Sequence, residues 1–170
     1  MKSRRPIPIT DEKFPVIPRM IATSLGVGFL PVCPGTWGAL LAIVIWLPIY
    51  LWLPGTPAWI ITSVAIVALA VSGTWASSVS EKYWGKDPVA ACVDETVGQL
   101  ISMLPLCGGP DVAPWWLIVV SLALFRFFDI FKPLGIRSLE RLPRGLGMMA
   151  DDVLAAIYSA ILVAAILYCL

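Results

Sequence analysis

Five carboxylate side chains of this sequence stand within or beside long apolar runs, where a charged residue is costly. They are Asp94, Glu95, Asp129, Asp151 and Asp152. An ionised side chain at the centre of a bilayer costs on the order of 2.5–3.5 kcal/mol, so such residues are generally paired or functional. Carboxylates that fold into one site also repel one another, and a divalent cation relieves that repulsion. Oxygen ligands of this kind favour magnesium or a similarly hard ion.

Two basic residues and a glycine-rich turn are candidates for binding a phosphate beside that ion. Arg126 and Lys132 each stand three residues from Asp129, so each can contact it along a helical face. Gly35 and Thr36 lie at the start of an apolar run, where backbone amides at a helix N-terminus can bind an anion. Simpler interpretations stay open. The arginine can form an ion pair with Asp129, the glycines can serve close packing, and a helix N-terminus alone can stabilise the double aspartate.

The composition places these residues in a membrane protein. The chain has 170 residues, of which 59% are hydrophobic and 14% charged, against roughly 45–50% and about 25% in soluble domains. This apolar excess and the net charge of +1 exclude a disordered chain, a coiled coil and a nucleic-acid-binding module. Histidine is absent, which excludes imidazole catalysis and histidine zinc ligands. The four cysteines lack metal-site spacing and are expected to be buried thiols: Cys33, Cys92, Cys107 and Cys169.

Five apolar runs have about the 17–25 residues that a membrane-spanning helix needs. They cover residues 36–53, 59–78, 89–106, 114–131 and 148–169. We therefore predict an all-α, polytopic membrane helical bundle with about five spans. The shorter run 20–30 predicts a re-entrant or interfacial helix, and the polar, proline-rich residues 1–19 predict an irregular cytoplasmic arm. Residues 20–170 then form a single membrane-embedded catalytic domain.

The distribution of lysine and arginine predicts the orientation of these spans. The loops 54–58 and 107–113 contain neither residue type, whereas the other loops and the N-terminal arm are basic. If all five runs cross, every basic segment lies on the cytoplasmic side, together with the N-terminus. The carboxylates then gather near that side. The third span carries Asp94 and Glu95 about a turn and a half inside, the fourth carries Asp129 about one turn inside, and the fifth opens with Asp151 and Asp152.

These features favour a phosphatase that acts on a phosphorylated lipid head group. Without histidine a phosphohistidine intermediate cannot form, and the sequence also lacks a Cys-x5-Arg loop and an Asp-x-Asp motif. The remaining route is metal-assisted attack of water, with a carboxylate as general base. Gly98, one turn after Asp94, would leave room beside the acids. Any of the five carboxylates could be the base, with one metal ion or two.

Four short sequence blocks, taken together in their order and spacing, are typical of one protein family. Residues 26–38 run from Gly-Val-Gly to Pro-Gly-Thr-Trp-Gly, and residues 93–98 read Val-Asp-Glu-Thr-Val-Gly. Residues 125–133 read Phe-Arg-Phe-Phe-Asp-Ile-Phe-Lys-Pro, and residues 145–152 read Gly-Leu-Gly-Met-Met-Ala-Asp-Asp. From about residue 21 to the C-terminus, the chain resembles the bacterial phosphatidylglycerophosphatase A family.

The resemblance implies hydrolysis of phosphatidylglycerophosphate to phosphatidylglycerol and phosphate, with magnesium, by a multi-pass protein of the bacterial cytoplasmic (inner) membrane. The expected partners are the phosphorylated glycerolipid and membrane lipids, with no nucleic acid and no obligatory protein partner. The implied magnesium ligands, which include one general base, are Asp94, Glu95, Asp129, Asp151 and Asp152. The implied contacts to phosphate or glycerol are Arg126, Lys132, Gly35 and Thr36.

The chain departs from the family pattern at four positions, none of them a carboxylate. Gly135 replaces a second proline after Lys132, Ala39 replaces a serine, and Arg144 and Ala156 replace glycines. Two alternative functions also use intramembrane acids. A lipid phosphotransferase expects an Asp-x-x-Asp-Gly…Ala-Arg…Asp pattern that is absent here, and an ion-coupled transporter expects acids through the membrane depth or paired repeats.

Overall fold

The computed structural model describes residues 14–108 and 113–170, and within those ranges it is helical without strands. The longer helices are α2 (Pro34–Trp52), α3 (Thr56–Trp84), α4 (Val93–Met103), α5 (Trp116–Phe131) and α7 (Gly145–Tyr168). The short elements are α1 (Val16–Ala22), α6 (Ile136–Leu139) and the 3-10 helices η1 (Val27–Phe29) and η2 (Leu104–Gly108). The all-helical architecture predicted from the apolar runs is confirmed.

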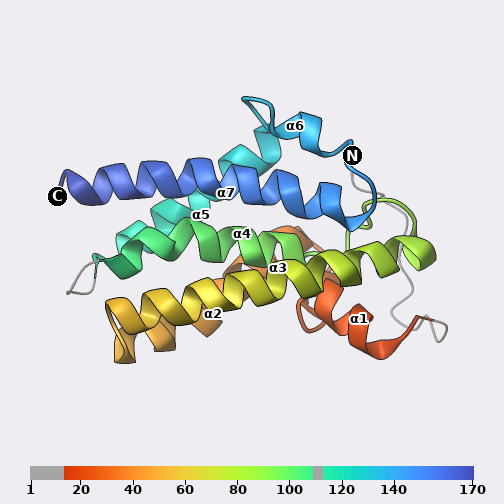
Figure 1. The fold of residues 1–170 in the computed structure, drawn as a ribbon, viewed down its shortest axis with the longest axis horizontal. Helices are drawn as coiled ribbons and strands as arrows, with labels where there is room; N and C mark the ends of the chain where they lie inside the picture. The colour runs from red at the N-terminus through yellow and green to blue at the C-terminus, as the bar shows by residue number, and fades with distance from the viewer. Residues whose placement is uncertain (1–13, 109–112) are drawn as a thin grey trace.

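The longer helices lie side by side and successive ones run in opposite directions (Figure 1). One end of the bundle carries α1, α6, the C-terminal end of α3 and the N-terminal ends of α4 and α7. The other end carries the α2–α3 turn and the C-terminus. The segments 85–92 and 132–144, which carry loop lysines and arginines, therefore lie at the same end.

Among the described residues, three helices are long and apolar enough to cross a membrane, and they are α2, α3 and α7. Their outer surfaces expose large apolar side chains such as Val44, Val67 and Ile161, as expected for helices in contact with lipid. The 29 residues of α3 would extend about 43 Å, which exceeds a hydrocarbon core of about 30 Å. Its polar C-terminal turns therefore have room to continue beyond an apolar layer.

The other two predicted spans correspond to shorter helices, so a count of five spans stays a prediction. Helix α4 has 11 residues and continues into η2, and α5 has 16 residues. Helix α4 packs against α2, α3, α5 and α7, and almost all of its side chains are buried. Its surroundings are therefore protein rather than lipid, and a short helix with polar residues is stable there.

Buried polar residues join α4 to its neighbours. The amide of Gln99 donates to Ser121 Oγ on α5 at 3.0 Å. The hydroxyls of Ser102 and Ser159, from α4 and α7, lie 2.6 Å apart. Hydrogen bonds of this kind remove the cost of burying a polar group in an apolar interior. They attach α4 to the two helices that carry the remaining acids.

The N-terminal part of the described chain differs from its prediction. Residues 1–13 of the expected arm lie outside the described residues, but α1 begins at Val16, inside that arm. Phe14 is buried, stacked on Tyr83 and edge-on to Trp84. The predicted short N-terminal helix is present as α1, but its predicted bounds of 20–30 are wrong. The helix ends at Ala22, because the chain turns through left-handed conformations at residues 24–26, and only η1 follows it.

The prediction of four buried thiols is correct for only two of the cysteines. Cys92 and Cys107 are buried, whereas Cys33 and Cys169 are exposed. Cys33 directly precedes α2 in a left-handed conformation, and Cys169 directly follows α7. Positions at the ends of helices have fewer packing neighbours than the apolar sequence around them suggests.

Glycines allow the helices to approach one another closely. A Cβ on Gly38 of α2 would lie 2.7 Å from the carbonyl oxygen of Cys92, just before α4. A Cβ on Gly98 of α4 would lie 2.5 Å from the ring of Phe125 on α5. The expectation that Gly98 leaves room beside the acids is therefore wrong, because the Phe125 ring occupies that space.

We predict that Gly98→Ala lowers the stability of the detergent-solubilised protein by about 1–3 kcal/mol, because the new methyl group overlaps the ring of Phe125. Thermal or denaturant unfolding would measure the change. In a double-mutant cycle with Phe125→Leu, the two substitutions should cost less together than the sum of their separate costs. Strict additivity would contradict the packing contact.

Candidate active site

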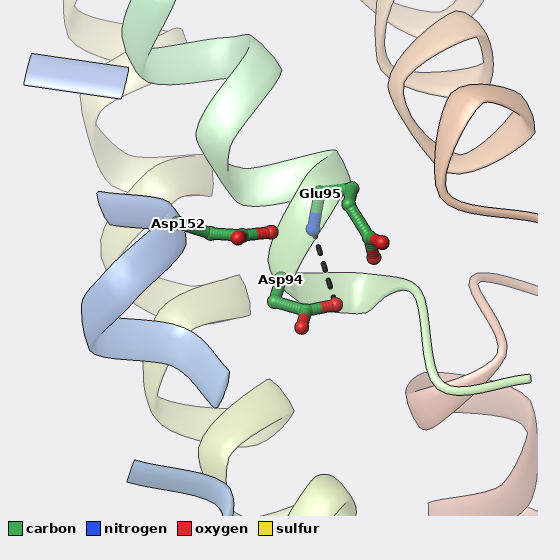
Figure 2. Close-up of side chains that lie close together, drawn as sticks. All are labelled: Asp94, Glu95 and Asp152. Atoms are coloured by element: carbon green, nitrogen blue, oxygen red, sulfur yellow. Dashed lines mark hydrogen bonds between the residues drawn. The ribbon is translucent and has the colours of Figure 1, made fainter. Parts of the chain in front are cut away.

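Helix α4 places two carboxylates at its N-terminus. Asp94 and Glu95 lie in its first turn, and both are buried. The sequence placed them about a turn and a half inside a span, but the helix begins only at Val93. The positive end of the helix dipole therefore stabilises both anions. The side chain of Asp94 also accepts a hydrogen bond from the Glu95 amide at 3.2 Å (Figure 2).

Helix α7 contributes a third carboxylate to the same place. Asp151 and Asp152 were expected to open this helix, but α7 begins at Gly145, so they lie about two turns inside it. Asp152 is buried and extends from α7 toward the first turn of α4 (Figure 2). One carboxylate oxygen from each of Asp94, Glu95 and Asp152 lies within 4.8 Å of the others. We call these three residues the acid trio.

The acid trio has the chemistry of a site for a hard cation. Its donors are all carboxylate oxygens, which magnesium prefers. Asp152 Oδ2 is buried and has no hydrogen-bond partner among the described residues. An orphan carboxylate oxygen is costly to bury, and a cation held by the acid trio would remove that cost. The residues present therefore fit the magnesium ion that the family resemblance implies.

Asp129 lies beside the acid trio but is engaged by Arg126. The guanidinium Nη1 of Arg126 lies 2.6 Å from Asp129 Oδ2 and 4.0 Å from Glu95 Oε1. The ion pair within α5 that the sequence left open is therefore present. The same arginine also approaches a member of the acid trio, so it partly balances two of the five predicted carboxylates.

Asp151 is engaged by Lys132. The ammonium of Lys132, just after α5, contacts Asp151 of α7 and lies 2.9 Å from Glu140 Oε1. Burial disfavours the charged lysine, but hydrogen bonds to Asp151 and Glu140 outweigh this effect and raise its pKa. The hydrogen bond from Lys132 lowers the pKa of Glu140. Sequence reasoning missed Glu140, since nothing in its local pattern connects it to the double aspartate.

These charged residues line two adjoining cavities. The first has a volume of about 550 Å³ and is lined by Asp94, Asp151, Asp152 and several basic residues. The second has a volume of about 530 Å³ and is lined by Gly35, Glu95, Arg126 and Asp129. Lys132 and Glu140 line both cavities. All five carboxylates predicted from the sequence therefore face one of two adjoining spaces.

The sequence did not predict that basic residues line the first cavity. It includes Lys86, Arg137, Arg141 and Arg144. In the sequence analysis, these residues served only to predict the orientation of the membrane spans. Their signal was the density of arginines in 132–144, between two acid-bearing runs.

Gly35 lies directly against the acid site, but Thr36 does not line it. A Cβ on Gly35 would lie 2.2 Å from Glu95 Oε1 and 3.0 Å from Arg126 Nη1. Thr36 is half-buried and lines neither of the two cavities described above. The glycine is therefore required for the approach of α2 to α4 and α5 at the site.

The family model described as phosphatidylglycerophosphatase A matches residues 20–167. The chain belongs to this family. It is accordingly a phosphatase associated with membranes, rather than a phosphotransferase or an ion-coupled transporter. The match covers all of the acid-site residues and leaves out only the first 19 residues and the last three.

Curated relatives cover most of the chain. A protein of Bacteroides thetaiotaomicron with the provisional name phosphatidylinositol-3-phosphatase is 46% identical over 149 residues, which are 87% of this chain and 92% of that protein. Phosphatidylglycerophosphatase A of Haemophilus influenzae is 37% identical over 88% of each chain. Phosphatidylglycerophosphatase A of Escherichia coli is 29% identical over 83% of this chain and 78% of its own. No solved structure matches the sequence significantly.

We predict that Gly35→Ala lowers phosphatase activity about 100-fold. The added methyl group would overlap the carboxylate of Glu95 and crowd the guanidinium of Arg126, so these side chains must move out of position. Phosphate release by the purified variant would measure the loss. The matched control is Gly108→Ala, whose added Cβ meets nothing within 4 Å. Equal activity of the two variants would show that Gly35 does not position the acid site.

Proposed function

We propose that this chain hydrolyses phosphatidylglycerophosphate to phosphatidylglycerol and phosphate, with magnesium, at the cytoplasmic face of the bacterial inner membrane. The observation that carries the proposal is the buried acid trio, with its oxygens within 4.8 Å of one another and an orphan oxygen on Asp152. Family membership supports the reaction, and two relatives carry the name of the corresponding enzyme.

The acid trio would hold the magnesium ion. When bound, the ion would supply positive charge that screens the phosphate oxygens and the leaving oxygen. Glu95 faces the second cavity, whereas Asp94 and Asp152 face the first. A phosphate between the two cavities would therefore be within reach of ligands from α4 and α7. The first turn of α4 would hold Asp94 and Glu95 in their ionised forms.

We assign the general base to a carboxylate outside the acid trio, either Asp129 or Asp151. A divalent cation withdraws more charge from a carboxylate than a single guanidinium or ammonium group does, so ligand oxygens are the poorer proton acceptors. Asp129 is oriented by Arg126, and Asp151 by Lys132. The chosen carboxylate would take a proton from water as the water oxygen attacks phosphorus and the glycerol oxygen leaves with its bonding electrons. This assignment narrows the sequence prediction, in which the five carboxylates supplied the magnesium ligands and one general base that could be any of them.

We propose the orientation with the N-terminus and the acid site in the cytoplasm, and five membrane crossings. The alternating helix directions support it, because they place the basic segments 85–92 and 132–144 at the end of the bundle that holds the acid trio. We also propose that residues 20–170 act as a single catalytic domain without an obligatory protein partner. The family match to residues 20–167 supports that boundary.

We predict that Asp94→Asn and Asp152→Asn each lower phosphate release at least about 100-fold at saturating magnesium, because each removes a charged ligand. Chelation should abolish wild-type activity, and magnesium should restore it. Calorimetric titration with magnesium should show weaker binding by both variants. The matched control is Asp111→Asn, in a loop that the sequence places on the opposite side of the membrane. Near-normal turnover by both site variants would contradict the assignment of Asp94 and Asp152 as magnesium ligands.

A second candidate substrate is phosphatidylinositol phosphate. The relative from Bacteroides thetaiotaomicron favours it, since that protein is named for such an activity and is 46% identical over 149 residues. Both lipids carry a phosphomonoester on a polar head group that is joined to diacylglycerol by a phosphodiester. The acid site could therefore serve either lipid, and the head group itself must decide between them.

We predict that kcat/KM for phosphatidylglycerophosphate exceeds that for phosphatidylinositol 3-phosphate by at least about tenfold, which corresponds to about 1.4 kcal/mol of transition-state binding. Both lipids would be presented in the same mixed micelles, and released phosphate would be measured. The reverse preference would replace the proposed substrate with the inositol lipid and leave the acid site and its metal unaffected.

A further inference from the structure

The two cations predicted to bind phosphate are already occupied by carboxylates. Arg126 contacts Asp129 and approaches Glu95. Lys132 contacts Asp151 and Glu140. A cation held by acids on two sides has less positive field to offer a substrate dianion. Further cations in the site would therefore strengthen the binding of the substrate phosphate.

Three arginines of the segment 132–144 are cations of this kind. Arg137, Arg141 and Arg144 line the first cavity together with Asp94 and Asp152 of the acid trio. All three are exposed, and none forms an ion pair with any residue in the described ranges 14–108 and 113–170. Their guanidinium groups therefore remain available to a ligand that enters this cavity.

The fold fixes the segment that carries these arginines. Lys132 ties its beginning to α7 through Asp151. The hydroxyl of Tyr158 on α7 donates to the carbonyl oxygen of Leu134 at 3.1 Å, and Ile136 is fully buried. A Cβ on Gly147 of α7 would lie 2.8 Å from the carbonyl oxygen of Leu142, so the segment packs closely on that helix. The arginines are thus held at the cavity by several independent contacts.

Arg144 occupies a costly backbone conformation. Its φ of 57° and ψ of −155° are close to a region that is essentially restricted to glycine. A side chain that is held in a strained backbone conformation and lines the acid-bearing cavity is a candidate for substrate binding.

We propose that Arg137, Arg141 and Arg144 form the binding site for the phosphomonoester of the lipid head group. Arginine presents a planar set of donors that matches phosphate oxygens, and its charge is permanent. The three positive charges balance a dianion that must approach the acid trio. This inference rests on the proposed function, and it assigns the arginines to substrate binding rather than to bond cleavage.

The central test compares Arg144→Gly with the wild type. Glycine relieves the backbone strain, so the apparent melting temperature in detergent should not fall, while the loss of charge should raise KM about tenfold and change kcat less than about threefold. Arg137→Gln and Arg141→Gln should raise KM in the same way, and Arg141→Lys should recover part of the loss. The matched control is Lys82→Gln, an exposed cation that lies outside the lining of both cavities. Its KM should not change.

Inorganic phosphate distinguishes the possible sources of the anion. If the arginines bind the phosphomonoester, the inhibition constant of free phosphate should rise in parallel with KM in all three charge-removing variants. A rise in KM without a change in phosphate inhibition would overturn the proposal in favour of the phosphodiester. A rise in KM on anionic vesicles that vanishes in uncharged detergent micelles would overturn it in favour of attachment to the membrane surface.

Direct binding of phosphate separates this inference from the proposed function. Calorimetric titration of the wild type and the arginine variants with inorganic phosphate requires no turnover. Arginine-dependent phosphate binding by a protein that hydrolyses neither lipid would contradict the proposed function and support the anion site. Magnesium-dependent hydrolysis with unchanged KM and unchanged phosphate binding in all three variants would contradict the anion site alone.

Discussion

The site depends on the burial of three carboxylates within 4.8 Å of one another, where α4 meets α7. Each charge is costly away from water, and each raises the cost of the others. The fold offsets part of this cost by starting α4 directly at Asp94 and Glu95, so that the helix dipole acts on both. The remaining negative charge is what the proposed magnesium ion would balance.

Two sets of ion pairs balance the acidic residues that surround the acid trio. Arg126 holds Asp129, and Lys132 holds Asp151 and Glu140. These pairs keep two further carboxylates near the acid trio without adding two unbalanced charges to it. They also join elements distant in the sequence, since Lys132 links the end of α5 to α7. The ion pairs of Lys132 therefore also hold the arginine-bearing segment at the first cavity.

Helix α4 explains why a polar site can exist inside so apolar a chain. It is surrounded by α2, α3, α5 and α7 and does not need an apolar surface for lipid. Its glutamine and serine residues form hydrogen bonds with Ser121 and Ser159, and Gly98 admits the ring of Phe125 from α5. The longer helices with exposed apolar surfaces form the exterior, so a short helix can carry two of the acids.

The sequence by itself determined the helical membrane class, the five acidic residues and the family, because mean hydropathy, charge placement and motif order are properties of the chain alone. It did not determine which acids form the trio, or that Arg126 and Lys132 are occupied by acids while Arg137, Arg141 and Arg144 line the cavity. Only the tertiary structure decided these points, along with the true starts of α4 and α7. The physical reason is that pairing between charges depends on distances across helices, and residues far apart in the sequence set those distances.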